Sequence, residues 1–115
     1  MTSAHDVRKQ LAEPARHLHR DIPEVIDSFA TMSRAVMQDG ALTAKVKELI
    51  ALAISATKQC DGCIAAHALG AAQQQATEQE VAEALSVVVM MNGGPGTVWA
   101  PRALAAYGEF NESPA

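Results

Sequence analysis

Aromatic residues are scarce in this 115-residue chain: two phenylalanines, one tryptophan and one tyrosine make up 3 % of it. So few rings exclude a platform on which nucleic-acid bases could stack. Positive charge is also in short supply, because nine Lys and Arg face 13 Asp and Glu and leave a net charge of −4. Nucleic acids favour clustered Lys and Arg, so we expect no nucleic-acid partner.

Long hydrophobic runs are missing as well. The longest two, residues 49–54 and 87–91, are far shorter than the roughly 20 apolar residues that cross a bilayer. The first ten residues lack the apolar core of a secretion signal. We therefore expect no membrane partner and a location in the cytoplasm. Because the thiol pool of that compartment keeps cysteines reduced, the two cysteines are not expected to form a permanent structural bridge.

No convincing strand pattern occurs, and the hydrophobic period is helical almost throughout. With 49 % hydrophobic and 19 % charged residues, residues 1–115 should fold as a single domain. We expect an all-α protein, a compact bundle of about six helices joined by short connections. The expected helices cover about 6–19, 23–38, 44–57, 60–75, 78–91 and 97–110.

Helix ends are marked by capping residues. Thr43 is a good N-cap for the third helix, and Thr77 with Glu80 forms a capping box at the start of the fifth. Asp39-Gly40 ends the second helix, and residues 92–96, Asn-Gly-Gly-Pro-Gly, form the sharpest break in the chain.

Two helices carry apolar faces that need cover. The second helix has a stripe spaced to be buried on one side, made up of Val25, Ile26, Phe29, Met32, Ala35 and Val36. The third helix is apolar on every side after Glu48. Such a helix is buried all round, by its own fold or by a second subunit. Together with residues 87–91 this surface is more than one small domain can hide, so we expect a homo-oligomer.

The residues that carry chemistry are Cys60, Cys63 and His67, at positions i, i+3 and i+7 of the fourth helix. On an α-helix these positions share one face. Cys60 falls at the first turn, where free backbone N–H groups and the positive end of the helix dipole favour a thiolate. His67, one turn beyond Cys63, can take or hold a proton near neutral pH.

Two other interpretations of the cysteine pair stay open at this point. A structural zinc site usually takes four ligands, and beyond the two cysteines only His67 and Glu48 are available. The pair could also be buried and inert. Taken alone, Glu48 would be a solvated charge beside Lys45 and Lys47, and His67 an ordinary histidine.

The same residues resemble the AhpD-like alkylhydroperoxidase branch of the carboxymuconolactone decarboxylase family. The resemblance rests on Lys47-Glu48-Leu49-Ile50-Ala51-Leu52-Ala53, on the twelve residues from Glu48 to Cys60, and on Cys60-x-x-Cys63-x-x-x-His67, and it covers roughly residues 23–108. Peroxidase members of the family can carry a histidine just before the second cysteine, where this chain has Gly62.

The resemblance implies a role for each of four residues. Cys63 matches the peroxidatic cysteine, and Cys60 the resolving cysteine that condenses with it to a disulfide. His67 and Glu48 match a proton relay that serves Cys63. The resemblance also implies a hydroperoxide substrate, an external dithiol donor, for which a lipoyl-type dithiol is the candidate, and a trimer or trimer-based hexamer. Because the chain has no glycine fingerprint of a dinucleotide site, we expect no nicotinamide or flavin cofactor.

The sequence thus predicts a thiol-dependent hydroperoxide reductase that acts through Cys63, Cys60, His67 and Glu48. A general disulfide oxidoreductase or redox sensor, using the same dithiol without specific peroxide chemistry, is the main alternative. A metal-binding or assembly module without enzymatic activity is the third.

Overall fold

The computed structural model describes residues 2–112, and over that range the chain folds into six α-helices and no strand. The all-α prediction is therefore confirmed. The helices are α1 (Ala4–Asp21), α2 (Pro23–Val36), α3 (Ala44–Thr57), α4 (Asp61–Gln73), α5 (Glu78–Asn92) and α6 (Gly94–Glu112). None of the helices in residues 2–112 is both long and apolar enough to cross a membrane.

The predicted helix starts are confirmed by hydrogen bonds. The Thr43 side chain accepts from the backbone N–H of Val46, and Thr77 and Glu80 form the reciprocal capping box that opens α5. The break after α5 is shorter than predicted. Gly93 alone separates α5 from α6, with a φ of +62° that a glycine adopts without a steric penalty.

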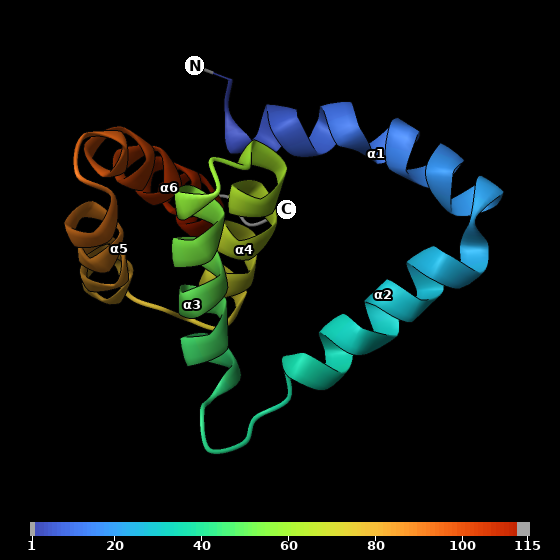
Figure 1. Cartoon of the computed structure of the whole chain (residues 1–115), viewed down its shortest axis with the longest axis horizontal. Helices are drawn as coiled ribbons and strands as arrows, with labels where there is room; N and C mark the ends of the chain where they lie inside the picture. The colour runs from blue at the N-terminus through green and yellow to red at the C-terminus, as the bar shows by residue number, and fades with distance from the viewer. Residues whose placement is uncertain (1, 113–115) are drawn as a thin grey trace.

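The core lies among α3, α4, α5 and α6, where α4 and α5 both pack against α3 and α6 (Figure 1). The largest fully buried side chains come from three of these helices: Leu52, Val81, Tyr107 and Phe110. The Tyr107 hydroxyl donates a hydrogen bond to the Ala76 carbonyl oxygen. Burial, with the nearby negative charges of Glu78 and Glu80, raises the pKa of Tyr107 above its usual value.

Helix α1 begins on the core and then leaves it. Its first two amides, of Ala4 and His5, donate to the Glu109 carboxylate of α6, and Ala4 and Val7 are buried. The rest of α1 runs outward, and α2 turns back from its far end, so that the two helices form a projecting arm (Figure 1).

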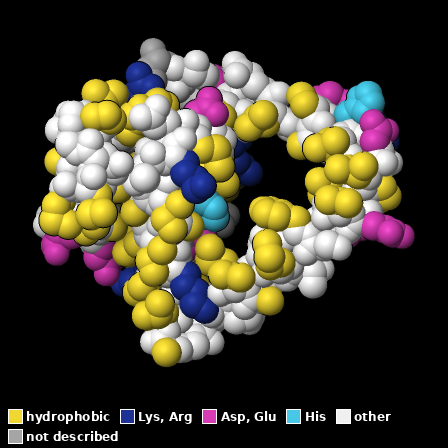
Figure 2. All heavy atoms as spheres, in the orientation of Figure 1, with side chains coloured by type: hydrophobic (Ala, Val, Ile, Leu, Met, Phe, Trp, Pro, Cys, Tyr) yellow, Lys and Arg dark blue, Asp and Glu magenta, His cyan; other side chains and the backbone are white. Residues whose placement is uncertain are grey.

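The apolar stripe of α2, expected to be buried, is not buried within this chain, because no residue of α2 is buried. Phe29 and Met32, in the middle of the stripe, are 63 % and 56 % exposed. The reason is that α2 contacts α1 near the bend and does not lie along the core. Figure 2 shows hydrophobic side chains on both sides of the open space between the arm and α3.

Candidate active site

The turn between α3 and α4 places the first cysteine at a helix N-terminus. Gln59 has a φ of +55°, a left-handed conformation that is uncommon outside glycine, and it reverses the chain after α3. Cys60 follows as the N-cap of α4, and its Sγ accepts a hydrogen bond from the Cys63 N–H at 3.2 Å. Backbone N–H groups therefore point at a cysteine sulfur, as the sequence predicted from helix geometry.

Cys60 and Cys63 are joined by a disulfide bond, with their Cα atoms 5.2 Å apart. Cys63 is exposed and Cys60 is half-buried, so the bond lies at the surface. An exposed disulfide can be reached by a reductant, unlike one sealed in a core. The two sulfurs are thus close enough to bond, and the pair is not buried.

His67 and Glu48 form a pair between α4 and α3, with Nδ1 of His67 3.1 Å from Oε1 of Glu48. The Glu48 side chain is 11 % exposed, whereas the His67 side chain is 34 % exposed. An ionised carboxylate can only accept hydrogen bonds, so Nδ1 donates to Glu48 and Nε2 remains free to take or give a proton. Glu48 is therefore a buried partner of His67 and not the solvated charge it would be on its own.

Gly70 makes the space in which Glu48 lies. A Cβ atom at position 70 would fall 1.3 Å from Oε2 of Glu48, a separation that no pair of atoms tolerates. The missing side chain lets the carboxylate from α3 lie against the backbone of α4, one turn after His67. The sequence analysis did not identify this residue, because an isolated glycine inside a helix does not by itself tell which side chain lies against it.

Gly62 lies under the arm. A Cβ atom there would be 2.9 Å from Cδ1 of Leu11 in α1, so this position between the cysteines is covered by an apolar side chain. A histidine at position 62 would have to displace Leu11. With glycine at position 62, the histidine that shares a helix face with the two cysteines is His67.

Metal-ligand geometry is not found in the part of the chain that the structure describes. Among residues 2–112, no group of three or more His, Cys, Asp or Glu side chains comes together to hold an ion. The two sulfurs are bonded to each other, and the His67 ring is bonded to Glu48. The zinc interpretation gains no support from this arrangement.

Comparison with known proteins identifies the family. The model of the carboxymuconolactone decarboxylase family matches residues 23–106, a span that includes Glu48, both cysteines and His67. The chain belongs to this family. The resemblance inferred from the sequence motifs is thereby confirmed at the level of the family.

Similar proteins match along most of their length. A Cupriavidus necator protein, H16_B0147, is 38 % identical over 109 residues, which cover 92 % of this chain and 96 % of that protein. A Haemophilus influenzae protein is 37 % identical over 101 residues, 88 % of this chain and 86 % of its own. The crystal structure of apo-lpg0406, a carboxymuconolactone decarboxylase family protein from Legionella pneumophila, superposes with a TM-score of 0.90. It is 37 % identical and covers 94 % of this chain and 96 % of its own.

The structure joins the four residues singled out from the sequence into two separate pairs. Cys60 and Cys63 form a disulfide, and His67, one helical turn after Cys63, is hydrogen-bonded to Glu48 of α3. The first pair lies at the start of α4, and the second joins α4 to α3.

Proposed function

We propose that the protein reduces hydroperoxides, and organic hydroperoxides in particular, by a dithiol–disulfide cycle in the cytoplasm. The observation that carries the proposal is the pairing of His67 with the buried Glu48 one turn after an exposed, bonded cysteine pair. Membership of a family that includes AhpD-like alkylhydroperoxidases supports the same function.

In the first step, Nε2 of His67 takes the proton from the Cys63 thiol, while the Glu48 carboxylate stabilises the positive charge on the ring. The thiolate attacks one peroxide oxygen, and the O–O bond breaks. Cys63 becomes a sulfenic acid, and the leaving alkoxide receives the proton from His67 and departs as an alcohol.

In the second step, the Cys60 thiol attacks the Cys63 sulfenic acid, forming the disulfide seen in the structure and releasing water. The Cα separation of 5.2 Å allows this bond. An external dithiol then exchanges with the disulfide: it is oxidised to its own disulfide, and both cysteines return to thiols. No nicotinamide or flavin is needed on this chain.

A general disulfide oxidoreductase is the second candidate, and one observation favours it. Cys60 is the N-cap of α4 and its sulfur faces the Cys63 N–H, the position that stabilises a thiolate in dithiol exchange proteins. In that case protein disulfides, and not peroxides, would oxidise the pair.

A stoichiometric thiol titration tests the proposed cycle. We expect the fully reduced protein to lose both thiols for each equivalent of cumene hydroperoxide consumed and to form the Cys60–Cys63 disulfide. The measurement is thiol counting with a chromogenic reagent alongside peroxide assay. Peroxide that disappears without loss of thiols, or thiols that persist while peroxide persists, would contradict the cycle.

We also propose that the chain works as a homo-oligomer, with a trimer or trimer-based hexamer as the form implied by the family resemblance. Helix α2 has only 14 residues, and a helix of that length is marginal in water unless its apolar face is packed. Its exposed stripe, and the exposed Ile50 and Ile54 of α3, would be covered by further copies.

Replacing Phe29 with aspartate should therefore shift the protein towards the monomer, because a charge in an apolar interface is costly to desolvate. Sedimentation velocity at micromolar concentration measures the change. The matched control is Thr31→Asp, which adds the same charge to α2 about 200° around the helix, away from the stripe. A wild-type monomer, or an equal effect of both variants, would contradict the assembly.

A further inference from the structure

A cavity of about 420 Å³ lies at the N-terminal end of α4, lined by Gln59, Asp61 and Ile64 but by neither cysteine. Its walls are the start of α1, the start of α4 and one face of α6. Five residues of α6 line it on one face of the helix: Trp99, Arg102, Ala105, Ala106 and Glu109. The volume is within the range of small-molecule sites.

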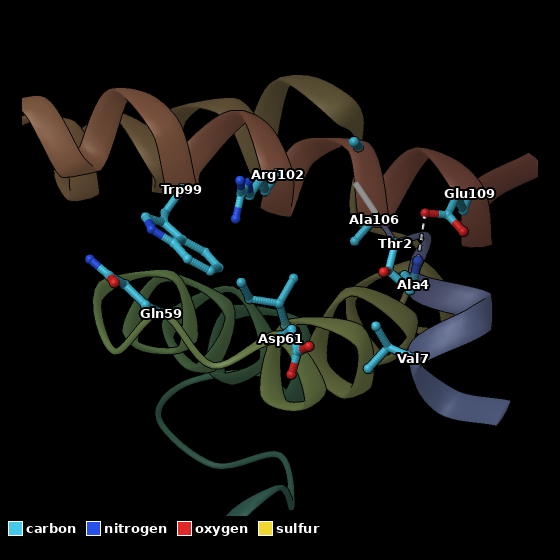
Figure 3. Close-up of a pocket in the computed structure, with 11 residues that line it drawn as sticks. Thr2, Ala4, Val7, Gln59, Asp61, Trp99, Arg102, Ala106 and Glu109 are labelled. Atoms are coloured by element: carbon cyan, nitrogen blue, oxygen red, sulfur yellow. Dashed lines mark hydrogen bonds between the residues drawn. The ribbon is translucent and has the colours of Figure 1, made fainter. Parts of the chain in front are cut away.

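The cavity adjoins the site through the turn before α4. Gln59 and Asp61 both line it, and Cys60 lies between them in the chain. Figure 3 shows Trp99 projecting from α6 towards this turn. A molecule held in the cavity would thus have one end against the turn that carries Cys60.

The two acidic residues of the cavity are already engaged by helix N-termini. Both carboxylate oxygens of Glu109 accept hydrogen bonds from the first amides of α1, at 2.9 and 3.1 Å. Asp61 is in the first turn of α4, where the helix dipole favours a negative charge, and its carboxylate points away from α6 in Figure 3.

Arg102 is the cation of the cavity. Its guanidinium lies over the Trp99 ring, with the central carbon 4.5 Å from the ring centroid. Stacking on a ring occupies the face of a guanidinium and leaves its N–H edge able to bind a carboxylate with two parallel hydrogen bonds. Val7, Ile64 and Ala106 contribute apolar side chains to the lining of the cavity.

We propose that this cavity binds small carboxylic acids with an apolar stem, the carboxylate on Arg102 and the stem along Trp99 and Ile64. Resting on the proposed function, such an acid is a reactant of the dithiol cycle. It is either a thiol acid, two molecules of which reduce the disulfide to the dithiol and leave as their own disulfide, or an acid hydroperoxide, which the dithiol reduces to an alcohol and water as the disulfide forms.

Trp99 is the sole tryptophan of the chain and so reports on the cavity directly. We expect octanoate to change its fluorescence saturably, and 1-octanol to bind about tenfold or more weakly, because it lacks the charge that Arg102 recognises. Arg102→Gln should weaken octanoate binding by a similar factor. Arg34→Gln, which removes an equal charge from α2, is the control and should bind as the wild type does. The absence of a saturable change, or equal binding by Arg102→Gln, would overturn the proposal.

Reaction rates tell whether the carboxylic acid bound in the cavity is the reductant or the hydroperoxide. Faster reduction of the disulfide by 6-mercaptohexanoate than by 6-mercaptohexanol, lost in Arg102→Gln, would assign the cavity to the reductant. Faster turnover of a carboxylated alkyl hydroperoxide than of a neutral one, lost in the same variant, would assign it to the peroxide. No preference in either series would overturn the link to the redox cycle. The octanoate titration needs no catalysis, so failure of the cavity and failure of the peroxidase proposal are separate results.

Discussion

Cys63→Ser should consume no hydroperoxide above the rate of the uncatalysed reaction. A serine hydroxyl does not ionise near neutral pH and cannot become a sulfenic acid, so the first step is lost completely. The measurement is steady-state peroxide consumption with a dithiol donor, with wild type and variant at equal concentration. The disulfide is not needed for folding in this view, because the reduced form is a normal stage of the cycle.

Cys60→Ser is the matched control, since it makes the same sulfur-to-oxygen change at the N-cap of α4 but keeps Cys63. It should react once with peroxide and then stop, with one added oxygen on Cys63 detectable by mass spectrometry and by a sulfenic-acid reagent. If Cys63→Ser, and not Cys60→Ser, acquires the sulfenic acid, the roles of the two cysteines are reversed. If Cys63→Ser turns over like the wild type, the peroxidase proposal is wrong.

Gly70→Ala should slow peroxide reduction by about 100-fold or more, the usual contribution of a positioned acid–base group. The added methyl would occupy the position of the Glu48 carboxylate, so Glu48 must move and His67 loses its partner. Alanine is otherwise the better residue inside a helix, by about 1 kcal/mol. If Gly70→Ala is slow but keeps the helical circular dichroism of the wild type, the loss of rate comes from the displaced Glu48 and not from unfolding.

Gly108→Ala makes the same change in α6, where a Cβ would meet nothing within 4 Å. It should retain wild-type activity and gain up to about 1 kcal/mol of unfolding free energy. Glu48→Gln should resemble Gly70→Ala, because it removes the carboxylate charge without adding volume. Full activity in both Gly70→Ala and Glu48→Gln would show that the Glu48–His67 pair plays no part in catalysis.

Much of the fold followed from local signals in the sequence. Thr43 and the Thr77–Glu80 box fixed the starts of α3 and α5, because capping depends on residues within one turn. The phase of Cys60, Cys63 and His67 placed them on one face for the same reason. The proximity of Glu48 to His67 depends on packing between two helices. Helical periodicity does not predict such a contact, so the pairing was predicted from the family resemblance alone.

Other features could not be read from local patterns. The stripe on α2 predicts a face that packs against something, but periodicity does not tell whether the partner is the same chain, and here α2 leaves the core. Gly70 and the Trp99–Arg102 pair gain their meaning only from side chains on other helices, Glu48 in α3 and Ile64 in α4. Such contacts are set by tertiary packing.

The rate at which peroxide oxidises the reduced wild-type protein, followed by stopped-flow thiol loss, tests the central proposal most directly. A Cys63 thiolate served by His67 and Glu48 should react with cumene hydroperoxide at least about 100-fold faster than free cysteine at the same pH. A rate equal to that of free cysteine would contradict peroxide-specific chemistry and leave the dithiol as a general exchange centre.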